Sequence, residues 1–200
     1  PSAPLRVRLG PGLVAHAGRI VAEKKGYLHE RPAVRDSGPQ MWVEGTAKAY
    51  VPATKDLVVG TVVSRHAEHY RVQIGAAHLA TLGILEFEGA TKRNRPQLEQ
   101  GALVYAQVLR AHKNMEPELT CVHMATGQAS GLGELPAACA TVVTVPLHTA
   151  LALLNPQNGL FNVMADHFDF TTSVGLNGRI HIQGSEFNDV ITLQLALQAV

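Results

Sequence analysis

The chain has 200 residues and a mass of 21.4 kDa, enough for one ordinary domain or two to three small modules. Hydrophobic residues make up 46% of it and charged residues only 16%, a balance that excludes disorder along the whole chain. The net charge of +1 is unevenly spread: residues 1–49 hold eight Lys/Arg and four Asp/Glu, whereas residues 126–200 hold one and five. Because phosphate binding needs clustered cations, a nucleic-acid surface must lie in the first two thirds of the chain.

No signal for a membrane or for secretion is present in the sequence. No apolar run approaches the ~20 residues that span a bilayer, and the first residues lack the apolar core of a secretory signal. The chain begins with Pro1 rather than methionine, so we expect it to be a trimmed piece. Two cysteines, Cys121 and Cys139, cannot build a disulfide framework or a zinc knuckle, which favours a reduced intracellular compartment.

Residues 1–49 predict a small N-terminal β domain. Short apolar runs such as Arg19–Ala22 are separated by glycine turns, of which Gly10–Gly12 is one. Frequent Gly and Pro between such runs favour strands over helices. Trp42, the only tryptophan, lies near the end of this segment, and we interpret it as a packing anchor between modules.

Residues 50–125 predict a five-stranded OB barrel. Tyr70, Val72 and Ile74 alternate with polar residues, which is typical of a strand with one solvated face. Gly60 is expected to mark a kink or bulge. Five short strands with a long insert after the third are typical of an OB fold, although a fragment of a β-sandwich also fits. The strand signals are Leu57–Val63, Tyr70–Ile74, His78–Leu82, Leu103–Ala111 and Leu119–His123.

Residues 126–200 predict a mixed α+β module behind a glycine-rich linker. In order, the signals are a linker with Gly127, Gly131 and Gly133, a strand at Thr141–Val145, a helix opened by Pro146 and ending at Leu154, and a strand pair within Phe168–Ile182. A last helix, which Ser185 can cap, is predicted to carry Phe187, Val190, Ile191 and Leu195 on one shared face.

No catalytic set emerges from the sequence. There is no phosphate-binding glycine loop followed by Lys-Ser or Lys-Thr, and the dispersed aspartates do not suggest a two-metal nuclease. His66 and His69 are three residues apart, but two ligands leave a metal site incomplete, so we predict no metal. Cys121 alternates with Leu119 and His123 on a strand and is interpreted as a core residue rather than a nucleophile. An enzyme is therefore the weaker interpretation.

Cations in three barrel loops favour contact with phosphates. OB barrels bind nucleic acid with the face of their second and third strands and with the flanking loops, and we expect the fold to bring two of these loops to one end. Only Tyr70 is expected to stack a base, so the predicted binding is weak and indifferent to sequence. The candidate RNA-binding residues are Arg65, His66 and Tyr70, Lys92, Arg93 and Arg95 in the insert, and Lys113 between strands four and five.

The stretch Phe87–Pro96, with Lys113–Glu118 downstream, resembles the ribosomal RNA-processing protein forty family, cap subunits of the eukaryotic RNA exosome. Gly10–Leu13, Tyr50-Val51-Pro52, Gly127–Gly133 and Gly175–Ile180 extend the resemblance over all three segments. The resemblance implies an N-terminal β domain (1–49), an S-one type OB domain (50–125) and a KH-type domain (126–200). It also implies a non-catalytic subunit without a cofactor, located in the nucleus, nucleolus and cytoplasm. Its implied partners are RNA, the RNase-PH-like ring and the other cap subunits.

The third module departs from an ordinary KH domain, which clamps RNA with a Gly-X-X-Gly loop between two helices. Here Gly175-Leu176-Asn177-Gly178 lies between two strand signals and contains no cation. Glycines with Asn177 inside favour a hairpin turn that needs positive φ, so Gly175, Asn177 and Gly178 are predicted to be structural. We therefore expect this module to bind ring proteins rather than RNA. A nuclease and a free-standing RNA chaperone or ribosome-assembly factor remain the alternatives.

Overall fold

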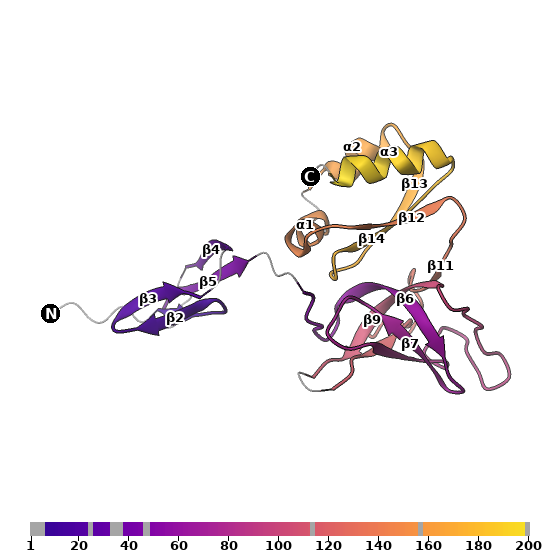
Figure 1. Ribbon diagram of the computed structural model, residues 1–200, viewed down its shortest axis with the longest axis horizontal. Coiled ribbons are helices and arrows are strands. Elements are labelled where there is room, and N and C mark those ends of the chain that lie inside the picture. The colour runs from indigo at the N-terminus through magenta and orange to yellow at the C-terminus, as the bar shows by residue number, and fades with distance from the viewer. Residues whose placement is uncertain are drawn as a thin grey trace. The chain divides into compact units, whose positions relative to one another are not determined.

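The computed structural model describes residues 7–23, 26–32, 38–45, 49–112, 115–155 and 158–198 (Figure 1). They belong to two compact units, Pro1–Ala47 and Lys48–Val200. Within the described ranges, no helix is long and apolar enough to cross a membrane.

The first unit is a small β domain, as predicted. Trp42 stacks on the ring of His29 at 5.5 Å between centroids, and the guanidinium of Arg31 lies 5.8 Å from the centre of its ring. These contacts hold Trp42 against its own sheet. Strands β1, β5 and β4 form one sheet in that order, and β2 pairs with β3 in a hairpin. The strands are β1 (Arg8–Leu9), β2 (Leu13–His16), β3 (Arg19–Ala22), β4 (Gly26–Arg31) and β5 (Gln40–Gly45).

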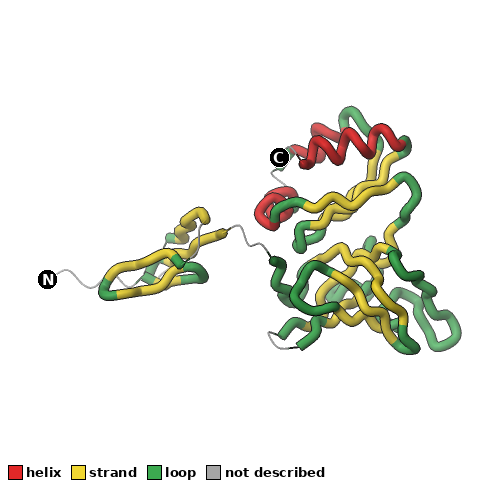
Figure 2. The backbone as a smooth tube through the Cα atoms, in the orientation of Figure 1, coloured by secondary structure: helices red, strands yellow, loops and turns green. Residues whose placement is uncertain are grey.

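The second unit begins with a closed five-stranded barrel. The order β10-β8-β7-β6-β9 closes because β10 pairs with β9 as well as with β8, and the β8–β10 pairing is parallel. Closure confirms the OB prediction and excludes the sandwich fragment. All five predicted strands are present: β6 (Leu57–Arg65), β7 (His69–Gln73), β8 (Ala80–Gly83), β9 (Leu103–Arg110) and β10 (Glu118–Thr120). Figure 2 shows these strands surrounding the barrel core.

Gly60 serves close packing rather than a bulge, which corrects the sequence interpretation. A Cβ at this position would clash with Cγ1 of Val72 on the neighbouring strand β7. The irregularity in the β6–β7 pairing instead lies between Val62 and Ser64. The missing side chain of Gly60 therefore lets the inward residues of β7 fill the barrel.

The predicted glycine linker is in part a strand. Strand β11 (Gly133–Leu135) pairs antiparallel with β9 and extends the barrel sheet. Gly131 has a φ of +86°, which suits the turn that brings the chain to this edge. The connection to the third module is therefore attached to the barrel by hydrogen bonds.

The remaining residues form the predicted α+β module. Its antiparallel sheet has the order β12-β14-β13, and α2 and α3 lie on the side of it away from the barrel (Figure 1). The helix predicted after Pro146 is α1, and the sequence analysis missed the short α2. The elements are β12 (Ala140–Thr144), α1 (Leu147–Leu153), α2 (Leu160–Ala165), β13 (Phe170–Val174), β14 (Arg179–Gly184) and α3 (Phe187–Gln198).

The predicted face of the last helix is wrong. Val190 is buried, as expected of a core-facing residue, but Phe187, Ile191 and Leu195 are exposed. Val190 shares the buried face with Leu193 and Leu197. The helix is apolar on nearly all sides, so periodicity alone could not choose the face that packs.

The glycine turn between β13 and β14 is inserted against the barrel. Asn177 is 7% exposed, and its Oδ1 accepts the backbone N–H of Val59 at 3.2 Å. Its Nδ2 donates to the carbonyl oxygens of Val59 and Ile74, at 2.8 Å each. One amide thus satisfies three backbone groups of β6 and β7, which are buried groups that need partners.

Gly175 allows the close approach to the barrel, and Gly178 lets the turn pack within its own module. A Cβ at Gly175 would lie 2.7 Å from the backbone nitrogen of Val59. Gly178 has a φ of +76°, and a Cβ there would lie 2.5 Å from the carbonyl oxygen of Val145. Asn177 does not adopt positive φ, so the turn needs glycine at Gly178 and an amide at Asn177 for different reasons.

Replacing Asn177 should loosen the module from the barrel. Asn177→Ala leaves the N–H of Val59 and two carbonyls without partners, and we expect a loss of about 3 kcal/mol of unfolding free energy, at about 1–3 kcal/mol per orphaned group. Urea unfolding measures the loss, and hydrogen exchange at the Val59 amide should accelerate. Asn188→Ala, an exposed change on α3, is the control and should leave both unchanged. Equal effects of the two variants would contradict this assignment.

Candidate nucleic-acid interface

The cations of the insert lie next to the loop between β6 and β7. Lys92, Arg93 and Arg95 are all exposed. Nε of Arg95 donates to the carbonyl oxygen of Lys92 at 3.1 Å, and its Nη1 donates to that of Ala67 at 3.4 Å. Lys92 and Arg95 also line a cavity of about 320 Å³ together with Glu68 and Glu86. Two of the three predicted loops therefore meet at one end of the barrel.

The β6–β7 loop adds a further cation and two imidazole rings to this end. Arg65 and His66 are exposed, at the point where β6 ends. The rings of His66 and His69 stack at 4.8 Å between centroids, with 24° between their planes. The backbone N–H of His66 donates to the carbonyl oxygen of His69 at 2.9 Å, which closes the loop. We call the exposed residues Arg65, His66, Lys92, Arg93 and Arg95 the basic end.

The third predicted loop belongs to the opposite end of the barrel. Lys113 lies outside the described residues. The backbone N–H of Lys55 donates to the carbonyl oxygen of Val108 at 2.8 Å, so the end of β9 lies beside the start of β6. His112, just after β9, lines a largely apolar cavity of about 500 Å³ with His78. The described part of this loop is therefore not part of the basic end.

Tyr70 cannot stack a base, which corrects the sequence prediction. Its side chain is fully buried, with 0% exposure, and lies edge-on to the ring of Phe87 at 6.4 Å. Its hydroxyl donates to the carbonyl oxygen of Pro96 at 2.5 Å and accepts the N–H of Leu98 at 3.3 Å. Tyr70 instead fastens the end of the basic insert to the barrel. Its alternation with Val72 already placed it on the core side.

Arg71 is the cation that sequence reasoning missed. It lies on the outer face of β7, and its guanidinium forms a bidentate pair with Glu116, in which Nη2 donates to Oε1 at 2.6 Å. The Thr81 hydroxyl donates to the same carboxylate at 3.4 Å. Hydrogen bonding from Arg71 lowers the pKa of Glu116, so the carboxylate is ionised at neutral pH and neutralises Arg71. The partners are 45 positions apart, so no local pattern could pair them.

Acidic side chains lie near this pair. Glu86, Glu116 and Glu118 line a cavity of about 480 Å³ together with Thr81 of β8. Oε2 of Glu118 also lies 3.7 Å from Nη1 of Arg110. Phosphates would meet carboxylates over this part of the strand face, whereas the basic end presents exposed cations.

Within residues 126–155 and 158–198, the third module offers no phosphate clamp. The turn at Gly175–Gly178 is buried against the barrel, and the α1–α2 connection, residues 154–159, contains one glycine and no Lys or Arg. Arg179, the only Lys or Arg in residues 126–200, is half-buried and donates to the carbonyl oxygen of Gln73 at 3.0 Å. Burial lowers the pKa of Arg179. The one cation of the module is thus used to hold the barrel.

The described residues contain no group of three His, Cys, Asp or Glu side chains that could hold a metal ion. Cys121 is 1% exposed within the barrel core, and burial, with a smaller effect of Glu86, raises its pKa to about 12. It is therefore a protonated core thiol, as predicted, rather than a nucleophile.

Comparison with known proteins assigns the family. Residues 50–133 match the family model described as exosome complex component RRP40, S1 domain. The exosome complex component rrp40 of Schizosaccharomyces pombe is 38% identical over 96% of this chain and 79% of that protein. The chain belongs to the RRP40 family of exosome complex components. Human RRP40 is 34% identical over 98% of this chain and 70% of its own length. This assignment confirms the resemblance found at Phe87–Pro96.

The fold is also found in a solved structure. A crystal structure assigned as an exosome complex RNA-binding protein superposes with a TM-score of 0.61 and covers 76% of this chain and 85% of that one. Its sequence identity of 20% shows a shared fold. The RRP40 S1 match ends at Gly133, where β11 joins the barrel sheet.

Releasing Arg71 from Glu116 should strengthen RNA binding. Glu116→Gln removes the charge that neutralises Arg71, so one more phosphate contact becomes available. The slope of log affinity against log salt should then steepen by about 0.7, the value for one contact on a single strand. Fluorescence anisotropy with a labelled oligouridylate measures it.

The control for this prediction is Glu134→Gln, the same change of charge at an exposed position on β11. It should leave the slope nearly unchanged. A similar steepening in both variants would mean that net charge alone, and not the freed guanidinium, governs binding.

Proposed function

We propose that this RRP40-family chain is a non-catalytic cap subunit of the RNA exosome that guides RNA and contacts the RNase-PH-like ring and the other cap subunits. The observation that carries the proposal is the basic end of its S1 barrel. There, exposed cations from the β6–β7 loop and from the insert gather around the hydrogen bond from Arg95 to Ala67. Its relatives, which are named exosome complex components, support membership in that complex.

The two modules of the second unit divide the work by charge. In the barrel, the side chains of Lys92, Arg93 and Arg95 contact the phosphate backbone of the RNA. The C-terminal module has five acidic residues and one engaged arginine, so it repels phosphates and suits contact with protein. As a subunit of a particle that processes RNA, the chain would be found in nucleus, nucleolus and cytoplasm.

The proposed RNA contact is weak and indifferent to sequence. Within residues 49–112 and 115–135, no Phe, Tyr or Trp side chain is exposed, so stacking contributes little. What remains is electrostatic contact with the backbone, which carries no sequence information. A weak site of this kind contributes most when it is one of several on a shared path.

Removing the insert cations should flatten the salt dependence of RNA binding by the assembled particle. With Lys92, Arg93 and Arg95 all replaced by Ala, up to three phosphate contacts are lost, and the slope should fall by about 2. Anisotropy titrations of labelled RNA across a salt series measure it. Arg110→Ala removes an exposed cation at the end of β9 and should leave the slope unchanged.

The same triple variant separates RNA binding from assembly. Native mass spectrometry should find it in the particle at the level of the unaltered chain, since these three exposed side chains lie outside the barrel core. An unchanged slope together with lost assembly would mean that the insert is a protein interface, and the RNA part of the proposal would be wrong.

The purified chain should not cleave RNA. Labelled single-stranded RNA incubated with it, in the presence of Mg²⁺ or of inorganic phosphate, should remain intact on a denaturing gel. Product that appears with the chain and disappears on mutation of its acidic side chains would support a nuclease instead.

A further inference from the structure

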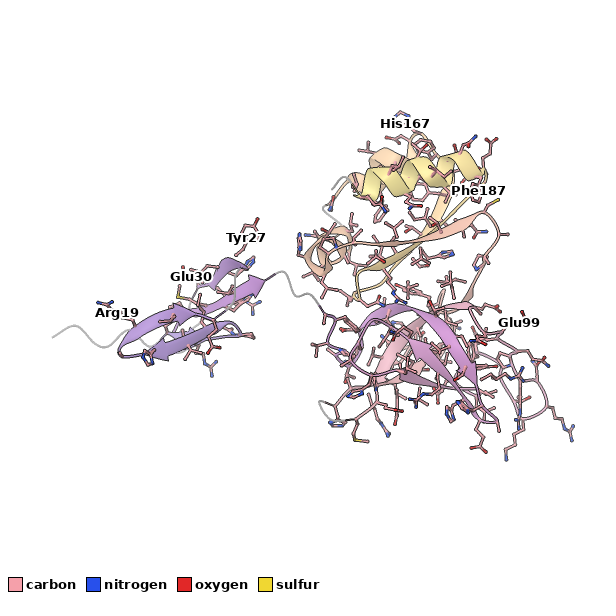
Figure 3. All side chains as sticks on the ribbon, viewed as in Figure 1. Arg19, Tyr27, Glu30, Glu99, His167 and Phe187 are labelled. Carbon is pink, nitrogen blue, oxygen red and sulfur yellow. The ribbon has the colours of Figure 1, made fainter. Side chains whose placement is uncertain are left out.

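Helix α3 carries large apolar side chains on its solvent side. Phe187, Ile191 and Leu195 are 64%, 44% and 61% exposed, and they occupy successive turns. Residues four apart in a helix lie one above the other, so the three form a continuous stripe. Single exposed apolar residues are ordinary, whereas a contiguous stripe marks an interaction surface. Figure 3 labels Phe187 at one end of the helix.

The fold itself does not need this stripe. The opposite side of α3 supplies Val190, Leu193 and Leu197, which are buried against β12 and β14. A surface helix normally places polar residues opposite such a face. The side chains that border the stripe, Asn188 and Gln198, are uncharged, so they do not break up its exposed apolar surface. Its apolar character therefore calls for a partner.

The charges around the stripe are negative. Glu186 and Asp189 lie at the same end of α3 as Phe187. Phe170 pairs with Gly184 across the β13–β14 hairpin, which brings Asp169 to this end as well. No Lys or Arg follows Arg179, and Arg179 is engaged with the barrel. A partner with Lys or Arg beside an apolar pocket would complement this surface.

We propose that the α3 stripe docks a partner protein whose apolar pocket is bordered by basic side chains, with Phe187 as the anchor. An RNA partner is disfavoured because the acidic end would repel its phosphates. A second copy of this chain is disfavoured because its own stripe is bordered by acids and by no Lys or Arg, so a two-fold contact between stripes would lack charge complementarity. The inference rests on the proposed assembly of the chain into a particle, and it names the surface of the C-terminal module that would make the contact.

Site-specific photo-crosslinking tests the inference in the assembled particle. p-Benzoylphenylalanine replaces Ile191 or Leu195 in the chain, and Thr171, exposed on β13, is the control position. We expect both α3 positions to give adducts with one protein, through a peptide that contains apolar residues and carries net positive charge. Thr171 should give no adduct with that peptide.

The surface variants Phe187→Ser and Leu195→Ser complete the test. Combined, they should lower the yield of the Ile191 adduct at least tenfold, while the urea midpoint of the free chain stays unchanged because both side chains are exposed. Adducts with RNA, with a second copy of the chain or with an acidic peptide would overturn the inference. So would the absence of any adduct from α3 in a particle that native mass spectrometry shows to contain the chain.

This outcome is distinguishable from failure of the proposed function. If the chain is found in no particle at all, the proposed cap role is wrong. If it is in the particle but α3 gives no adduct, the cap role stands and only the docking surface is wrong.

Discussion

The buried side-chain amide of Asn177 determines that the turn between β13 and β14 is a structural element. Asn177 satisfies backbone groups of two barrel strands at once, and because such groups are costly to leave unpaired, the β13–β14 turn is held against the barrel. A turn in that place cannot close on a nucleic-acid backbone. The arginine next to the turn is also engaged, through the carbonyl of Gln73. This turn of the C-terminal module is thereby committed to structure, and the proposed phosphate contacts fall to the barrel.

The barrel in turn separates its charges. At one end, Arg95 ties the insert to the β6–β7 loop, and Tyr70 secures the far side of that insert from within the core. On the strand face, Glu116 neutralises Arg71. The buried tyrosine and the ion pair have the same consequence: they remove an aromatic ring and a cation from the strand face and leave exposed cations at the loops. The proposed RNA contact therefore depends on loop cations that a hydrogen-bonded scaffold holds in place.

The sequence predicts the architecture well because strand alternation, glycine turns and the insert are all local signals. These signals correctly predict the five barrel strands and the start of α1. The predicted exposure of Tyr70 was wrong because the prediction asked for a ring that could stack on a base. The alternation of Tyr70 with Val72 indicates instead that both side chains face the core. The face of α3 was misplaced because apolar residues occur on both sides of that helix. The pairing of Arg71 with Glu116 could not be predicted, since it joins residues that only barrel closure brings together.

Helix α3 carries large apolar side chains on its exposed side as well as on its packed side. A helix whose packed face cannot be chosen from sequence is one with more apolar surface than its own fold can bury. In a module with a single engaged cation, the excess cannot be assigned to RNA, and a second copy of the chain would bring no complementary cation. The ambiguity of the sequence and the exposed stripe of the structure thus have one physical cause: the chain is patterned for two cores, its own and one that it shares with a partner.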